Sequence, residues 1–169
     1  MKTVITFVLF FLSLSPFAQN LNRRIVDEKA TGEILIGICN KQGLLEAPFS
    51  DWFNTEYNSC NLSTRAITQL KQYSDKLKVT IVFGTWCSDS RREVPRFFKL
   101  ADTIGLVSEN LKLIAVDTKK TVNDVDISGL KLEKVPTFIF YVGDKEIGRI
   151  VETPKVNIET DLLNILQPK

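Results

Sequence analysis

The chain has 169 residues, of which 44% are hydrophobic and 25% are charged. This balance is typical of one globular domain that can bury a core, and it excludes wholesale disorder. The net charge is only +2 and no basic tract is present, so we expect no binding to nucleic acid or to a membrane surface. Histidine is absent, which excludes Ser-His and Cys-His catalysis. With only three cysteines as soft ligands, we expect no metal site and no cofactor.

Residues 1–18 have the pattern of a cleaved secretory signal. Lys2 precedes an apolar run from Val4 to Leu14, and the small residue Ala18 stands just before Gln19. The run is too short to span a bilayer comfortably. Because the chain has no cysteine near this segment for a lipid anchor and no retention tail, we expect export, most simply to a bacterial periplasm.

Residues 19–62 are interpreted as an N-terminal extension that packs on the main domain at 63–169. Within it, "GEILIGICN" at 32–40 is a candidate edge strand. The following segment is rich in aromatic residues at spacings that a helix would place mostly on one side, which favours core packing over a binding site. These aromatic residues are Phe49, Trp52, Phe53 and Tyr57.

From residue 64 onward, helical and strand patterns alternate. Apolar residues at helical spacing after Ser63 predict a first helix: Ala66, Leu70, Tyr73 and Leu77. The β-branched run "VTIVF" at 79–83 predicts a strand buried on both faces. A second helix is predicted after the Trp-Cys turn from one apolar stripe: Val94, Phe97, Ala101 and Ile104.

The second half of this domain predicts three more strands and a final helix. "LKLIAV" at 111–116 is the next strand, and a polar connector leads from it to a short segment at 127–132. "TFIFYV" and "EIGRIV" flank residues 143–145 and predict a hairpin. The last helix carries Ile158, Leu162, Ile165 and Leu166. This order predicts an α/β fold in which helices cover both faces of a mixed sheet.

Cys87 is the strongest candidate for a reactive residue. It follows Gly84-Thr85-Trp86 at a turn from a strand to a helix, where unpaired backbone N–H groups and the helix dipole stabilise a thiolate. The thiolate is the species that attacks disulfides, so the position favours thiol–disulfide exchange over the role of an inert buried cysteine. Arg91 and Arg92 follow on the same helix; we expect them to form a solvated, locally paired face, although they could also orient an acidic partner such as glutathione.

The stretches "VTIVFGTWCSDSRREVP" at 79–95 and "KVPTFIFY" at 134–141 resemble the thioredoxin superfamily. The resemblance covers roughly residues 64–167 and implies a three-layer α/β/α sandwich with a mixed sheet of four or five strands. It also implies that Cys87 is the nucleophile and that Trp86 precedes it in the motif. Pro95 corresponds to the proline that bends the active-site helix. Pro136 corresponds to the cis-proline, with Val135 lending its backbone to a bound partner.

Two positions depart from the family pattern. Ser90 stands where a second, resolving cysteine is usual, and Ile81 stands where thioredoxins commonly carry a buried acid. We expect the Ser90 hydroxyl to contact the Cys87 sulfur, since it can donate a hydrogen bond to a thiolate but cannot resolve a disulfide. The predicted catalytic residues are therefore Cys87 and Ser90, with Trp86, Val135 and Pro136 as substrate-binding residues.

Three functions are compatible with a Trp-Cys-x-x-Ser motif. In the first, Cys87 forms a mixed disulfide that the second thiol of the substrate, or a small external thiol, resolves. In the second, Cys39 or Cys60 is a distant resolving thiol. The simplest disulfide assignment for three cysteines in an exported protein, however, joins Cys39 to Cys60 and leaves Cys87 free. In the third, the protein is a binding module without redox turnover. We favour a thiol–disulfide oxidoreductase whose partners are protein or small-molecule thiols and disulfides.

Overall fold

The computed structural model describes residues 21–167, so the predicted signal at 1–18 lies outside the described residues. A five-stranded mixed sheet forms the centre of the molecule, in the order β3-β5-β4-β6-β7. Only β5 and β4 run parallel, and each of the other neighbouring pairs is antiparallel. The sheet strands are β3 (Gly37–Cys39), β4 (Leu77–Phe83), β5 (Leu111–Ala115), β6 (Thr137–Val142) and β7 (Lys145–Val151). The predicted thioredoxin-like α/β fold with a mixed sheet is thus confirmed.

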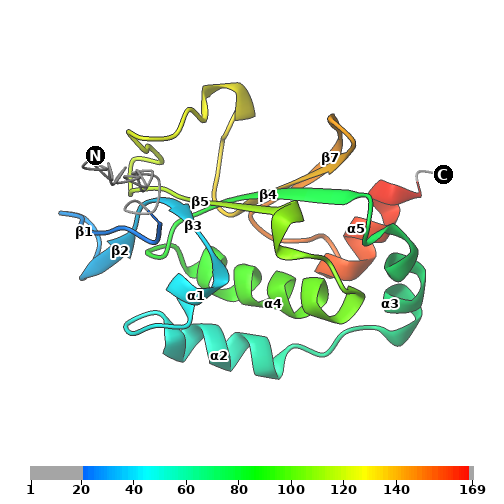
Figure 1. Ribbon diagram of the computed structural model, residues 1–169. Coiled ribbons are helices and arrows are strands. Elements are labelled where there is room, and N and C mark those ends of the chain that lie inside the picture. Colours follow the sequence, from blue (N-terminus) through cyan, green and yellow to red (C-terminus); the bar gives the residue numbers. More distant parts are fainter. Residues whose placement is uncertain (1–20, 168–169) are drawn as a thin grey trace, which may run out of the picture.

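The α-helices gather on one side of this sheet (Figure 1). The central helix α4 packs between the sheet and α2, and α5 packs against β7, α3 and α4. A single large apolar core joins these helices to the inward side chains of β4 and β6, among them Ile81, Phe83 and Phe138. The helices are α1 (Lys41–Leu44), α2 (Ser50–Ser59), α3 (Thr64–Leu70), α4 (Ser88–Ile104) and α5 (Ile158–Leu166).

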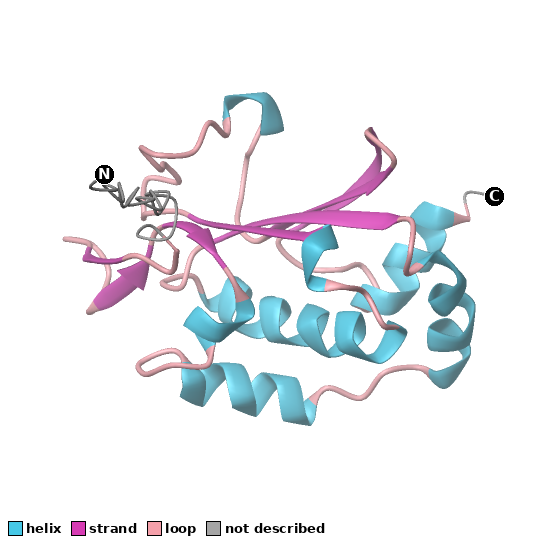
Figure 2. Cartoon of the chain, viewed as in Figure 1, coloured by secondary structure: helices cyan, strands magenta, loops and turns pink. Residues whose placement is uncertain are grey.

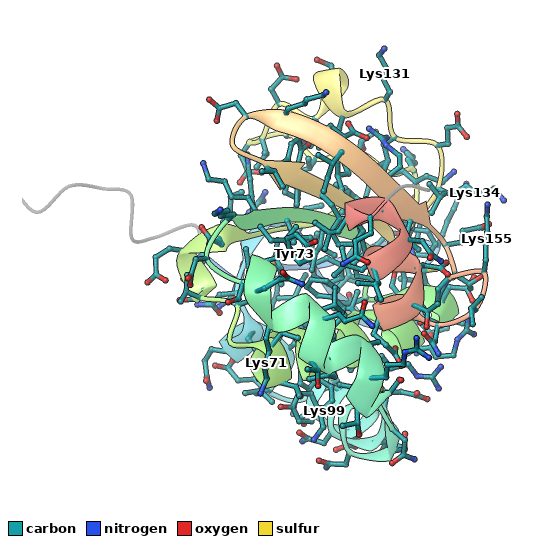
Figure 3. The ribbon with its side chains drawn as sticks, turned by 90° about the vertical axis from the view of Figure 1, so that its right-hand side faces the viewer. Lys71, Tyr73, Lys99, Lys131, Lys134 and Lys155 are labelled. Carbon is teal, nitrogen blue, oxygen red and sulfur yellow. The ribbon has the colours of Figure 1, made fainter. Side chains whose placement is uncertain are left out.

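The opposite face of the sheet is covered by the connector at 116–136, which lies almost entirely in loop conformation (Figure 2). Its one helical element is the short 3-10 helix η4 (Ser128–Leu130). The predicted helical layer on this face is therefore replaced by a loop, because the apolar residues of the connector are too sparse and irregularly spaced for a helical stripe. They still form a small second core with the sheet residues Val82 and Ile114. Lys131 and Lys134 mark this side in Figure 3, opposite Lys71 and Lys99 on the helical side.

Several predicted elements of the main domain are present. Strand β4 has the predicted run buried from Ile81 to Phe83, and α4 buries the predicted apolar stripe. The hairpin of β6 and β7 turns at Gly143 and Asp144, and α5 follows as predicted. The first helix is shorter than predicted: α3 ends at Leu70, a 3-10 turn η2 (Lys71–Tyr73) follows, and Leu77 is already the first residue of β4.

The N-terminal segment contributes to the same sheet and core. "GEILIGICN" is divided into β2 (Glu33–Leu35), which pairs with β1 (Arg24–Val26), and the edge strand β3. The division falls at Ile36, just before Gly37, whose φ of +87° favours glycine. Phe49 and Phe53 are buried, as their helical spacing predicts, and Phe53 packs on Phe98 of α4 with ring centroids 5.7 Å apart. Within residues 21–167, no helix is both long and apolar enough to cross a bilayer.

Candidate active site

Cys87 is the N-cap residue of α4, directly after the turn that leaves β4. Its backbone is extended, with φ −86° and ψ 127°, and no side chain caps the helix in the part of the chain that the structure describes. The N–H groups of the first turn thus remain available to stabilise negative charge on the sulfur. The thiol is half-buried, which leaves it accessible to a partner.

Val135 and Pro136 lie beside Cys87, although they are about fifty residues later in the chain. Cys87 Sγ donates a hydrogen bond to the Val135 carbonyl oxygen at 3.3 Å. The Val135–Pro136 peptide bond is cis, and both residues are buried. The loop is fixed on either side, because Thr137 Oγ1 donates to the Lys134 carbonyl at 2.6 Å and Glu152 N donates to the Pro136 carbonyl at 2.7 Å.

Trp86 is half-buried over the connector side of the sheet. Its indole Nε1 donates to the Val116 carbonyl at 2.9 Å. The ring also lies against Gly84, where an added Cβ would stand only 2.5 Å from Nε1. Gly84 therefore has to lack a side chain for Trp86 to occupy this place, a requirement that no sequence motif indicated.

Ser90 is fully buried in the first turn of α4 and is bonded differently from the prediction. Its Oγ accepts a hydrogen bond from Gly84 N at 3.2 Å, while the bond of Cys87 Sγ goes to Val135. The predicted contact between the hydroxyl and the sulfur is therefore corrected: Ser90 points back toward the end of β4 and ties the active-site turn together. The sequence could not reveal this, since the bond depends on how tightly the turn folds back on the helix.

Ile81 occupies the place of the missing acid and is completely buried in the main core. A buried carboxylate is present on α4, that of Glu93, but it is paired with Arg92 at 2.7 Å. Arg92 also contacts Asp89 at 2.7 Å, and these two carboxylates raise the pKa of the Arg92 guanidinium, the hydrogen bond to Glu93 most strongly. The predicted local charge pairing on this helix face is thus present for Arg92. Pro95 lies inside α4 and is buried.

Thr85 is a site residue that the sequence did not single out. It is buried, and its Oγ1 accepts a hydrogen bond from Leu35 N at 3.2 Å. Its carbonyl accepts from Arg91 Nε at 2.6 Å. Thr85 thus joins the N-terminal strand β2, the active-site turn and α4. A small polar residue between a strand end and a Trp-Cys pair is the signal that could have indicated it.

The predicted disulfide between Cys39 and Cys60 is not present, since all three cysteines are free thiols. Cys39 lies on the edge strand β3, where burial raises the pKa of its thiol to about 12. Cys60 follows α2, and its pKa is raised mainly by burial and then by the negative charge of Glu159. The two residues are separated because they belong to different layers of the fold.

Comparison with known proteins identifies the class to which this fold and site belong. The family model described as thioredoxin matches residues 50–162, and the chain belongs to the thioredoxin family. Membership supports a function of the thiol–disulfide oxidoreductase type in general. The match begins within α2, so it includes part of the segment that was predicted as an extension.

Two relatives and one solved structure illustrate the similarity. Thioredoxin-2 of Saccharomyces cerevisiae is 33% identical over 96 residues, which cover 50% of this chain and 85% of the yeast protein. A thioredoxin-like protein of Acanthamoeba polyphaga mimivirus is 28% identical over 100 residues, covering 59% of this chain and 70% of the viral one. The crystal structure of a Pseudomonas aeruginosa protein of unknown function aligns with a TM-score of 0.50 at 16% identity, over 68% of this chain and 80% of that one. The last similarity concerns the fold alone.

Proposed function

We propose that this protein is an exported thiol–disulfide oxidoreductase in which Cys87 is the single nucleophile. The observation that carries the proposal is that an accessible thiol, that of Cys87, is followed one helical turn later by a serine and not by a second thiol. Cys87 is half-buried at the N-cap of α4 beside Pro136, and the residue one turn later, Ser90, is fully buried and bonded to Gly84. The site has the attacking group of a thioredoxin and lacks the second cysteine of the motif.

The proposed reaction begins when the Cys87 thiolate attacks one sulfur of a disulfide. A bond forms between Sγ and that sulfur, the original disulfide bond breaks, and the other sulfur leaves as a thiolate. A second thiol then attacks the mixed disulfide and releases Cys87. If this thiol belongs to the substrate, the result is isomerisation without net redox change. If it is an external small thiol, it forms a disulfide with the substrate sulfur, and a second molecule of that thiol breaks this bond, so that two small thiols are oxidised to one disulfide and the substrate is reduced.

The positions of the other two cysteines support resolution by an outside thiol. Cys39 is buried, and a pKa of about 12 leaves almost no thiolate at neutral pH. Cys60 lines a small cavity together with Glu93, which lies six residues along α4 from Cys87. At 1.5 Å per residue this is a separation of about 9 Å along the helix axis. Because a disulfide needs Cα atoms within about 7 Å, this separation argues against Cys60 as the resolving thiol, as burial argues against Cys39.

Export belongs to the same proposal and rests on the pattern of residues 1–18. A bacterial periplasm would supply both disulfide substrates and small thiols. Fractionation of cells that produce the full chain would test this destination; a mature protein that retains residues 1–18 in the cytosol would contradict it.

The activity is tested by exchange of a disulfide substrate in the presence of a reducing thiol. We expect Cys87→Ser to lower the rate to that of the uncatalysed exchange, because Cys39 is buried and Cys60 stands at the C-terminal end of α2. Cys60→Ser is the matched control, since it removes another half-buried thiol, and it should leave the rate unchanged. Labelling with iodoacetamide at pH 7 should modify Cys87 before Cys60. A rate that Cys87→Ser does not change would instead support a binding module.

A further inference from the structure

Three cationic side chains near Cys87 differ in what they already bind. Arg92 is paired with Asp89 and Glu93, each at 2.7 Å, and Lys134 is paired with Glu152. Arg91 makes one hydrogen bond, from Nε to the Thr85 carbonyl at 2.6 Å, and its two terminal Nη groups have no partner among residues 21–167. Arg91 is also exposed, so these groups are available to a ligand.

The position of the Arg91 guanidinium is set by buried structure. Thr85, which accepts the Nε bond, is only 1% exposed, and its own hydroxyl is held by Leu35 N of strand β2. A guanidinium fixed through Nε keeps its two Nη donors in a planar fork that fits a carboxylate. Because this orientation exists before a ligand arrives, less conformational entropy is lost on binding.

Arg91 is also close to the nucleophile. Its backbone N–H donates to the Cys87 carbonyl at 3.0 Å, which places it one helical turn after the cysteine. Its side chain also turns back toward the cysteine, since its Nε reaches the carbonyl of Thr85, two residues before Cys87. The competing negative charge nearby, that of Asp89, is already paired with Arg92.

From these contacts we propose that Arg91 is a specificity-determining residue that binds a carboxylate of the disulfide substrate. The proposal rests on the function proposed for Cys87 and names the substrate class: disulfides that carry a carboxylate a few bonds from the attacked sulfur. Arg92 has no free charge for this purpose. The recognised group is the same whether it belongs to a small acidic disulfide or to an acidic residue beside a cystine in a peptide.

The test compares attack on an anionic and on a neutral chromogenic disulfide, 5,5′-dithiobis(2-nitrobenzoate) and 4,4′-dithiodipyridine, in the rapid phase that Cys87→Ser lacks. We expect Arg91→Gln to slow the reaction with the anionic probe about fivefold at low ionic strength and to leave the neutral probe unchanged. Arg65→Gln on α3 removes another exposed arginine and should change neither rate. Added salt should reduce the difference between wild type and Arg91→Gln.

A pair of peptide disulfides with Glu or Gln beside the cystine separates the two sources of the carboxylate. A loss confined to the small probe would assign Arg91 to small acidic disulfides, and a loss with the Glu peptide would extend the role to proteins. If Arg91→Gln slows both probes equally, Arg91 acts on the sulfur rather than the substrate, and the proposal fails. Unchanged rates would also overturn it. In either case a rapid phase that depends on Cys87 leaves the proposed function intact, whereas its absence in the wild type refutes that function.

Discussion

Ser90 stands where the family pattern has a resolving cysteine, the residue that would release a mixed disulfide. In this protein its side chain makes a hydrogen bond within the active-site turn instead. Its hydroxyl accepts from Gly84 N in a fully buried setting. An unsatisfied buried N–H costs about 1–3 kcal/mol, so this bond helps to hold the turn that presents Cys87. Ser90 thus lacks the thiol that the proposed reaction would need for release within the motif, and its hydroxyl helps to hold the turn that carries Cys87.

Ser90→Cys should restore a dithiol motif. We expect the variant to reduce a protein disulfide faster than wild type with the same reductant, because a thiol one turn after Cys87 can resolve the mixed disulfide. The rate of reduction is measured from the turbidity that appears when the chains of a disulfide-linked protein separate and precipitate. Ser108→Cys, at an exposed serine outside the site, is the control. No gain would mean that the acid missing at Ile81, or the partner surface, limits the reaction.

Individual site residues could be predicted from the sequence only where a motif contains them. Cys87, Trp86 and Val135 are brought together, with the cis bond between Val135 and Pro136 that the resemblance implied. The bond of Ser90 and the roles of Gly84 and Thr85 could not be predicted, since each depends on a contact between segments whose relative position the sequence does not state. Leu35 and Thr85, for example, are fifty residues apart and joined by one hydrogen bond.

At the scale of elements, α2 fixes the position of α4 through aromatic packing. Phe53 is 1% exposed and lies between Phe98, with ring centroids 5.7 Å apart, and Tyr57, at 5.9 Å. Arg96 of α4 adds an ion pair to Glu56 of α2 at 2.8 Å. The helix that presents Cys87 is thus held from both sides, by the sheet and by α2.

Phe53→Ala should destabilise the protein by about 3–5 kcal/mol, because the lost ring leaves a cavity between α2 and α4. Chemical denaturation followed by circular dichroism measures the free energy of unfolding. Leu45→Ala, at a residue that is 37% exposed, should cost less than about 1 kcal/mol. A small loss for Phe53→Ala would mean that these aromatic residues serve a binding surface instead of the core.

Strongly periodic or continuously apolar segments gave correct element predictions, and short segments did not. The stripe of α4 and the run of β4 are long enough to determine their structure. The predicted first helix ended at Leu70, since Ser74 and Asp75 favour a turn before Leu77 enters the sheet. The division of "GEILIGICN" depends on two different pairing partners, which a single segment cannot reveal.

At the scale of the whole molecule, the fold distributes three thiols over three environments. Cys87 is accessible at a helix start, Cys60 is half-buried beside acidic residues, and Cys39 is 5% exposed in the core. Cys39 is set apart by burial, and Cys60 by its place at the C-terminal end of α2 beside negative charge, whereas Cys87 caps the start of a helix. The same burial makes stability depend on pH.

Stability should fall as the pH rises above about 9. Burial raises the pKa of Cys39 from 9.0 to about 12, so between these values the unfolded chain releases a proton that the folded protein keeps. This linkage lowers the free energy of unfolding by about 1.4 kcal/mol per pH unit, and the contribution is fully present below pH 9. The raised pKa of Tyr57, about 12 and due mainly to burial, acts in the same direction.

Denaturant unfolding from pH 8 to 11 would measure this slope in wild type and in Cys39→Ala. We expect the variant to be less stable at pH 8 but to have a shallower decline. Val79→Ala, at an equally buried residue without a titrating group, should lower stability and keep the wild-type slope. If the unfolding free energy falls with pH equally steeply in wild type and Cys39→Ala, the Cys39 thiol has the same pKa in the folded and unfolded states, and the prediction is wrong.

The two faces of the sheet, one covered by helices and the other by a loop, also differ in how much change in sequence length they tolerate. Changes of length on the helical side would disturb a closely packed core, because α4 and its neighbours share it. The connector at 116–136 needs only a few apolar contacts to stay on the sheet, and the rest of it is surface loop, which tolerates insertions. Since its last residues, Val135 and Pro136, lie beside Cys87, variation of this loop can change the surface next to the thiol while Cys87 and its helix remain as they are.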